Sequence, residues 1–493
     1  PAFPPAGGSV TVTAASVADT SKTASATVTI AVSNASLSGP YAFSFSGEAA
    51  GGGLESAAGS FVADGQGNLS AGAEDLNTPT AVLADLPFTG TYSVGADSRG
   101  TATITDSQGT FTFKFVVVSN QHGLLTEFDG TATVAGTLDR QDTTAFSSSA
   151  LQGGYVFGFT GRDTAGNPVA SAGQFTADGS GGIKSGVEDI NDNGAVAASQ
   201  QFTGTYNVAS SGRGTASLSS PGGTSNYAFY VVSANQVDYV ETNASPAVGG
   251  IAFRQQTATF SNSSFSGNYF FYFASHLLAG QKGGSNGLPA VAAGVLAADG
   301  SGNISGKEDE ILGTIGYIGN PLTGQYTVAQ NGRATADLTM TIVGGVKVNF
   351  TVTFYMVSPS TAIILETLPS SSPVMLGSVL AQQGSPFSNG SVNGRYGFAL
   401  QGAQYRLLGP ESDVGQVTAD GNGNLAATED VDQAGQLTSG VKSTGTYSLD
   451  ASGHGTASLG ASKYLVYAVS PSQIFFVDDS STGIREGFAE LQY

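Results

Sequence analysis

The chain has 493 residues and no Cys, and its 17 Lys and Arg stand against 37 Asp and Glu, a formal net charge of −20. The acidic balance disfavours a nucleic-acid partner, because phosphates are neutralised by clustered basic side chains. The lack of Cys excludes disulfides and thiolate chemistry within this sequence, and no apolar run is long enough for a membrane span.

The first segment, residues 1–37, has a sequence unlike anything that follows it. Apolar and small polar residues alternate on both sides of the stretch ADTSK, which predicts a β-hairpin. The alternating apolar residues are Val10, Val12, Val28, Ile30 and Val32. A two-stranded hairpin is marginal in water. We therefore expect it either to belong to a domain of a longer chain or to complete its sheet on another molecule by strand addition. The second option predicts a head-to-tail polymer in which these residues carry assembly.

The wording VTVTA…ADTSKTASATVTI within residues 9–33 resembles the closing hairpin of a bacterial immunoglobulin-like domain of surface proteins. The resemblance is confined to this segment, and the remainder of such a domain is missing from the sequence. It implies a protein of the bacterial cell surface.

Four repeats follow the hairpin. Repeat 1 is 38–141, repeat 2 with its connector is 142–255, repeat 3 with its connector and insertions is 256–382, and repeat 4 with its connector is 383–493. Each repeat carries the same ordered anchors: Gly-x-Tyr, an Asp-Gly turn, a Glu-Asp pair, Thr-Gly-x-Tyr, an Ala-containing stretch and a closing Gln. The Ala-containing stretch is Arg-Gly-Thr-Ala in repeats 1 and 2, Arg-Ala-Thr-Ala from Arg333 in repeat 3 and His-Gly-Thr-Ala from His454 in repeat 4. In repeat 1 the anchors are Tyr41, Asp64, Glu74 with Asp75, Tyr92, Arg99 and Gln141. A period of this length favours a row of domains over a solenoid.

Within a repeat the hydrophobic period is two. In YAFSFSG, Tyr41, Phe43 and Phe45 alternate with small or polar residues, which is typical of a half-buried strand. About eight such strands per repeat, joined by short Gly, Asp and Asn turns, predict an antiparallel meander. The predicted fold is therefore all-β, with four tandem barrel-like domains preceded by a hairpin. A two-sheet sandwich remains the alternative, because counting strands does not separate the two.

The connectors between repeats have a constant length. From each closing Gln to the next opening Tyr is 14 positions, and Phe146, Phe260 and Phe387 each lie five positions after the Gln. A flexible linker has no reason to keep an apolar residue in one place. We therefore expect each Phe to pack at a junction between domains and to hold the domains as a semi-rigid rod. A tether that kept its length through recent duplication is the alternative.

Two acidic patterns resemble functional sites. Asp64, Asn68 and Glu74 could bind calcium, but three ligands are few, and Asp-Gly-x-Gly-Asn is also a strong hairpin-turn signal. Glu74 and Asp75 could be catalytic carboxylates, but adjacent residues of a strand point to opposite faces. A structural role is favoured, such as a carboxylate bonded to Tyr92 or Arg99. His122, His276 and His454 show no metal-binding spacing.

The four repeats resemble uncharacterised tandem-repeat surface or secreted proteins of soil bacteria, which implies secretion. The favoured function is that of an extracellular structural protein, a stalk or fibre subunit that associates with itself, with no cofactor and no enzymatic activity. The first alternative is a multivalent adhesin for cell-surface or matrix glycans, with Tyr230 and Tyr272 stacking on sugars. The second is an array of barrels that bind small apolar ligands, for which an open interior would be the sign.

Overall fold

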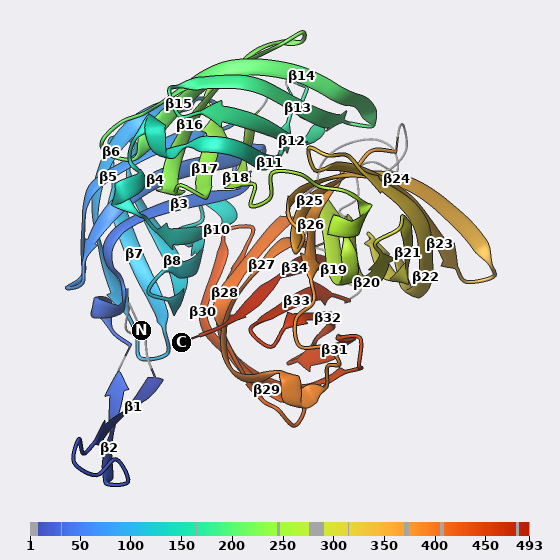
Figure 1. The fold of residues 1–493 in the computed structure, drawn as a ribbon. Helices are drawn as coiled ribbons and strands as arrows, with labels where there is room; N and C mark the ends of the chain where they lie inside the picture. The colour runs from blue at the N-terminus through green and yellow to red at the C-terminus, as the bar shows by residue number, and fades with distance from the viewer. Residues whose placement is uncertain are drawn as a thin grey trace.

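The structure is a computed structural model that describes residues 8–30, 32–163, 165–243, 247–275, 290–313, 315–368, 374–404, 409–479 and 483–492. The strands form four closed, eight-stranded antiparallel barrels and one two-stranded sheet (Figure 1). The predicted all-β fold and meander order are confirmed, and the architecture is a barrel rather than a sandwich. The described residues include no helix long and apolar enough to cross a membrane.

The barrels follow one another along the chain. Barrel 1 consists of β3 (Ser38–Ala49), β4 (Leu54–Asp64), β5 (Asn68–Asn77), β6 (Val82–Val94), β7 (Arg99–Thr105), β8 (Thr110–Ser119), β9 (His122–Glu127) and β10 (Ala132–Arg140). Barrel 2 consists of β11 (Gln152–Arg162), β12 (Pro168–Asp178), β13 (Gly182–Asp192), β14 (Ala195–Val208), β15 (Arg213–Ser220), β16 (Gly223–Ser233), β17 (Gln236–Glu241) and β18 (Ala247–Arg254).

Barrels 3 and 4 repeat this order. Barrel 3 consists of β19 (Ser266–Ser275), β20 (Ala290–Asp299), β21 (Asn303–Leu312), β22 (Ile315–Val328), β23 (Arg333–Ile342), β24 (Val346–Ser358), β25 (Thr361–Glu366) and β26 (Leu376–Ala381). Barrel 4 consists of β27 (Asn393–Gln404), β28 (Gly409–Asp420), β29 (Asn424–Gln433), β30 (Gln436–Leu449), β31 (His454–Leu459), β32 (Ser462–Ser470), β33 (Gln473–Asp478) and β34 (Gly483–Leu491). The insertion of repeat 3, with His276, falls largely on residues 276–289, outside the described residues.

The period-two aromatic stripe fills each barrel. Tyr41, Phe43 and Phe45 of β3 belong to the buried core of barrel 1, and their rings stack on neighbouring aromatic rings. In barrel 2 the ring centroids of Phe157 and Phe159 are 4.8 Å apart. These lumens are therefore lined by apolar side chains. The side chains leave empty space of about 500 Å³ in barrel 1 and about 610 Å³ in barrel 2, part of it open to solvent.

The connectors close one end of each barrel. They contain short 3-10 helices, namely η1 (Asn34–Ser36), η2 (Thr143–Ala145), η3 (Ser148–Ala150), η4 (Asn262–Ser264) and η6 (Asn389–Ser391). The residue just after η1, Leu37, is buried in the core of barrel 1, and its carbonyl accepts a 2.6 Å hydrogen bond from the Tyr92 hydroxyl. Equivalent bonds join Tyr206 to Leu151, Tyr326 to Phe265 and Tyr447 to Val392. The Thr-Gly-x-Tyr anchor therefore recurs because its Tyr ties the connector to the barrel end.

The four barrels form a closed ring rather than a rod (Figure 1). Strands of barrel 1 contact barrel 2, barrel 2 contacts barrel 3 and barrel 3 contacts barrel 4. Strands β27 and β28 of barrel 4 return to contact β8, β9 and β10 of barrel 1. The expectation of a semi-rigid rod is wrong, because each barrel turns relative to the one before it and the turns close the circle.

The hairpin is separate from the ring. Strands β1 (Gly8–Ala15) and β2 (Thr23–Ile30) pair only with each other in a two-stranded sheet, with Val10 opposite Val28. Figure 1 shows this sheet projecting away from barrel 1. The predicted hairpin around ADTSK is confirmed, and Val32 follows β2 instead of lying within it.

Candidate functional sites at the barrel interfaces and the hairpin

An aspartate on the third strand of each barrel binds a basic side chain of the next barrel. The carboxylate of Asp75 in β5 accepts hydrogen bonds from Arg213 Nε at 2.7 Å and Arg213 Nη2 at 2.6 Å. The pairing repeats around the ring as Asp189 with Arg333, Asp309 with His454 and Asp430 with Arg99. The last pair joins barrel 4 to barrel 1. The partner is thus the basic anchor of another barrel, so the expected bond from the carboxylate to Arg99 or Tyr92 of its own repeat is wrong.

A buried tyrosine completes three of these four contacts. The Tyr230 hydroxyl donates to Asp75 at 2.7 Å, and Tyr355 and Tyr467 donate in the same way to Asp189 and Asp309. Although burial works against the charge of Asp309, hydrogen bonds from His454 and Tyr467 lower its pKa. At the fourth interface Val116 occupies the position of the tyrosine, and the Ser439 hydroxyl donates to Asp430 instead. A backbone N–H ten residues after the aspartate donates to it at all four interfaces.

The closing glutamines also act between barrels. Each side-chain amide donates to a backbone carbonyl in the sixth strand of the following barrel, a bond that fixes the end of one barrel against the next. The pairs are Gln141 with Val231 (2.8 Å), Gln255 with Met356 (3.0 Å), Gln382 with Ala468 (2.9 Å) and Gln492 with Val117 (2.7 Å). Gln492 lies in barrel 4 and Val117 in barrel 1, so this contact too closes the ring.

Apolar clusters lie between the barrels, separate from the four lumens. The cluster between barrels 3 and 4 has twelve buried residues among those described, including Phe270 and Phe475. The cluster between barrels 4 and 1 has four: Val116, Val118, Leu124 and Val414. Burial of apolar surface is the main favourable term in such contacts. The interface that closes the ring is therefore the one with the smaller apolar contribution.

A histidine adds charge to this closing interface. His122 of barrel 1 lies 2.7 Å from Asp139 and 3.3 Å from Glu490 of barrel 4. Burial opposes its protonation, but Asp139 and Glu490 outweigh burial and raise the pKa of His122 to about 9. The imidazolium is therefore charged at neutral pH and bridges carboxylates of the first and last barrels.

The Glu-Asp pair splits between two environments, as strand alternation predicts. Asp75 faces the next barrel, whereas Glu74 is only 2% exposed, and burial raises its pKa to about 8. Glu127 lies on the same side of its strand as the core residue Leu125, and burial raises its pKa to about 9. The two carboxyl groups of the pair do not converge on one point, so they cannot flank a bond together.

The calcium candidates do not come together. The carboxylate of Asp64 accepts hydrogen bonds from the backbone N–H groups of Gln66, Gly67 and Asn68 at 2.7–3.0 Å, and Asn68 Nδ2 donates to it at 2.6 Å. The bonds from Asn68 and the backbone lower the pKa of Asp64 to about 2. Glu74 is buried in barrel 1. Within the described ranges, no group of three or more His, Cys, Asp or Glu could hold a metal ion. The stretch is a hairpin turn that its own Asp stabilises.

The connector phenylalanines lie at the junctions, each against the barrel that it precedes. Phe260 is 3% exposed in the core of barrel 3, and Phe387 is 4% exposed in that of barrel 4. Phe146 is half-buried against the core of barrel 2. Each ring packs on a turn glycine with positive φ, namely Gly212, Gly332 or Gly453, where a Cβ would meet the ring.

The structure places Val10, Val12, Val28 and Ile30 in the paired strands of the hairpin, but their side chains lie outside what it describes. Tyr230 and Tyr272 are not sugar platforms on an outer surface. Tyr230 is fully buried, and the Tyr272 ring packs on Phe475 of barrel 4 with centroids 4.6 Å apart. The hypothesis that Tyr230 and Tyr272 stack on sugars is therefore wrong, because both side chains face a neighbouring barrel.

No family model matches this chain, and no curated protein matches it. Among solved structures, it is similar to a protein of unknown function from the DUF3598 family of Nostoc punctiforme, with 11% identity, a TM-score of 0.17 and coverage of 70% of this chain and 98% of that one. It is also similar to a double mutant of the vaccine antigen Transferrin Binding Protein B from Haemophilus parasuis, with 10% identity, a TM-score of 0.18 and coverage of 76% and 83%. Scores this low carry no argument about function.

Proposed function

We propose that this protein is an extracellular structural protein without enzymatic activity, in which the ring of barrels is a rigid head and the hairpin joins it to another copy by strand addition. The observation that carries the proposal is the sheet topology. The four barrels are closed, and among the described strands only the β1–β2 sheet is open. Open edges present unpaired N–H and C=O groups that recruit further strands.

The topology also defines the acceptor. A closed barrel offers no edge for a donated hairpin, so the hairpin of a second copy is the acceptor that we propose. A compact head of this size is about 60 Å across, whereas strands of one sheet are about 4.8 Å apart. Heads on one side of a continuous sheet would collide. Two hairpins paired with their heads at opposite ends avoid the collision, and this pair is the proposed unit of the surface assembly.

The test compares the full chain with a chain that lacks residues 1–31. The deletion must spare Asn34 and Leu37, because both cap barrel 1. Light scattering and electron microscopy should show paired or larger assemblies for the full chain and monomers for the shortened one. Val28→Pro, which interrupts β2 at unchanged chain length, should also yield monomers. Val17→Ser in the exposed turn is the matched control and should still assemble. If the full chain is monomeric at the highest concentration tested, the proposal fails.

A further inference from the structure

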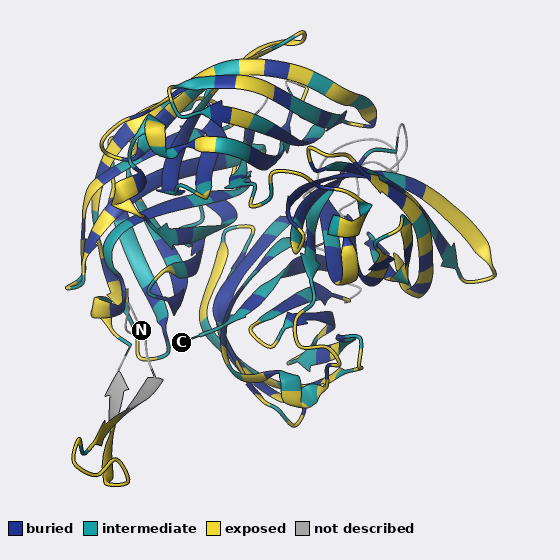
Figure 2. Ribbon diagram, in the orientation of Figure 1, coloured by how far each residue is buried: buried dark blue, intermediate teal, exposed yellow. Residues whose placement is uncertain are grey.

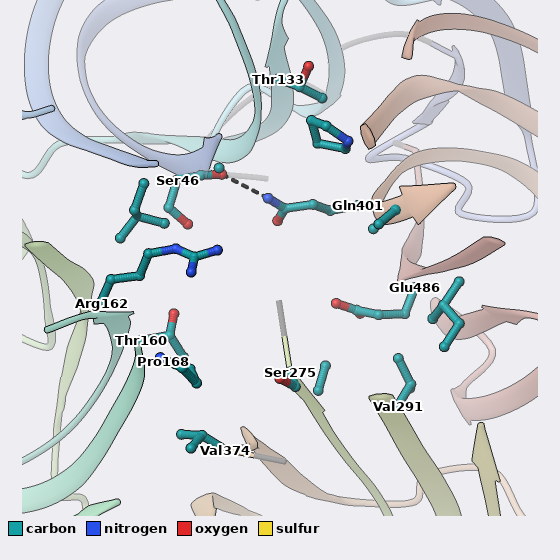
Figure 3. Close-up of a pocket in the computed structure, with 18 of the residues that line it drawn as sticks. Ser46, Thr133, Thr160, Arg162, Pro168, Ser275, Val291, Val374, Gln401 and Glu486 are labelled. Atoms are coloured by element: carbon teal, nitrogen blue, oxygen red, sulfur yellow. Dashed lines mark hydrogen bonds between the residues drawn. The ribbon is translucent and has the colours of Figure 1, made fainter. Parts of the chain in front are cut away.

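All four barrels contribute to one chamber at the centre of the ring (Figure 3). Its walls include equivalent positions of the four first strands, five residues after each opening Tyr: Ser46, Thr160, Ala274 and Gln401. The empty space in the chamber is about 840 Å³, part of which is open to solvent. The cavity within it has a volume of about 50 Å³. A guest of a few non-hydrogen atoms fits this room.

A buried arginine points into the chamber from barrel 2. Arg162 is 7% exposed, and Figure 3 shows its guanidinium directed toward the central space. Within the described residues it donates one hydrogen bond, from Nη1 to the Gly166 carbonyl at 2.8 Å, and no carboxylate oxygen lies within 4 Å of it. Burial lowers the pKa of Arg162, and the nearby Glu48 only partly opposes this. A guanidinium has five N–H donors, so most of its donor capacity is unused.

The acidic groups in the walls do not neutralise this cation. Glu411 accepts a 2.7 Å hydrogen bond from Arg485, so its carboxylate is already paired with another cation. Burial raises the pKa of Glu486 to about 8, so at pH 7 its carboxyl group is mostly protonated. The hydroxyl oxygen of Ser275 is buried and has no hydrogen-bond partner among the described residues. Taking a cation out of water is costly unless an anion pairs with it. The chamber therefore favours an anionic guest.

We propose that the chamber binds a small carboxylate with a short apolar chain. The fork of Arg162 matches the two oxygens of a carboxylate, which it binds in a bidentate manner. The apolar chain of the guest rests against Val169, Val291 and Val374, which also line the space. Ser275 is placed in the same wall to donate its hydroxyl proton. This site lies between the barrels and does not depend on the proposed role of the hairpin.

The test is isothermal titration calorimetry of the full chain with butyrate at pH 7. Inorganic phosphate and 1-butanol are the comparison probes, because the first lacks the apolar chain and the second lacks the charge. We expect saturable binding of butyrate that is tighter than that of either comparison probe. Arg162→Gln should weaken butyrate binding about tenfold or more, and Arg162→Lys should weaken it less, because the charge remains but the fork is lost. Arg254→Gln, which removes a charge from the same barrel outside the chamber, should leave binding unchanged.

A second variant guards against loss of fold in Arg162→Gln. Ala403→Leu keeps the arginine and fills the chamber, because Ala403 lines it and is 3% exposed. It should abolish butyrate binding while circular dichroism shows the barrels intact. The proposal is overturned if the full chain shows no saturable butyrate binding or if Arg162→Gln binds as the unaltered chain does. Phosphate binding as tight as butyrate binding would overturn the assignment to carboxylates.

Discussion

At the scale of single residues, two adjacent acids of one strand show how the fold separates charge. Glu74 lies in the lumen of barrel 1, where burial raises its pKa. Asp75 points outward, and Arg213 and Tyr230 of barrel 2 surround it. A buried carboxylate remains ionised only where cations and donors compensate for the lost water. The interface therefore depends on the aspartate, and the lumen holds an acid in its neutral form.

The first prediction at this scale concerns Asp75→Asn. The side chain of Asp75 is fully buried and that of Arg213 is 19% exposed, so the change removes the buried anion from a largely buried guanidinium and leaves only the exposed Asp85 near it. The free energy of unfolding should fall by about 3 kcal/mol, measured by chemical denaturation. Asp85→Asn is the matched control, because Asp85 lies 3.6 Å from Arg213 Nε and is 65% exposed. It should cost less than about 1 kcal/mol. Equal losses in the two variants would show that burial of the ion pair is unimportant.

At the scale of elements, the connectors are parts of the barrels that they precede. Phe260 and the turn glycine Gly332, whose φ is +92°, pack together at the end of barrel 3. Only a glycine is free of strain at such a φ and leaves space for the ring. The connector N–H of Phe260 also donates to the carbonyl of Gln330 in the same turn. The constant connector length thus reflects a seat for the Phe ring and a fixed path between neighbouring barrels.

The prediction for this element is that Phe260→Ala and Phe146→Ala differ in their effects. Phe260 is 3% exposed, whereas Phe146 is half-buried. Removing the buried ring should lower the free energy of unfolding by about 3–5 kcal/mol, and removing the half-buried one should cost clearly less. Thermal unfolding of the two variants under one set of conditions measures the difference. If the order is reversed, the connectors do not derive their contribution from ring burial.

Sequence periodicity was enough to predict the barrels but not their arrangement. The stripe Tyr41, Phe43, Phe45 indicated one buried face, and the structure confirms it. The second buried face has a signal of its own in the sequence, because Val116, Val117 and Val118 place apolar side chains on both sides of β8, a pattern typical of strands buried on both faces. The partner of Asp75 had no such signal, because a carboxylate and an arginine in different repeats show no sequence relation. The constant connector length constrains the distance between neighbouring barrels, but it does not indicate the direction in which each barrel is rotated relative to the one before it.

At the scale of the whole molecule, the ring closes where no connector helps. Barrels 1 and 2, 2 and 3, and 3 and 4 are joined by chain, whereas barrels 4 and 1 are held by non-covalent contacts alone. These contacts include Arg99 with Asp430, His122 with Glu490, Gln492 with Val117, Thr133 with Asp432, Gln401 with Ser46, and a small apolar cluster. Figure 2 shows buried residues on the inner faces of the ring and exposed ones on the outer hairpins. A short connector keeps two neighbouring barrels close together in the chain, and this lowers the entropic cost of forming the contact between them. Opening should therefore begin between barrels 4 and 1.

Val414→Asp tests this order of opening. Val414 is 1% exposed and packs with Val116, Val118 and Leu124 at the closing interface, so an aspartate there buries a charge without a cation to pair with. We expect barrel 4 to separate from barrel 1 while each barrel stays folded. Small-angle scattering should then show a larger radius of gyration, with unchanged circular dichroism. Val343→Asp, at a position 91% exposed, is the control and should leave the radius unchanged. If the radius of gyration of Val414→Asp is unchanged, the three connected interfaces alone hold the ring. The first and last barrels would then meet only because of the angles between neighbouring barrels at those three interfaces.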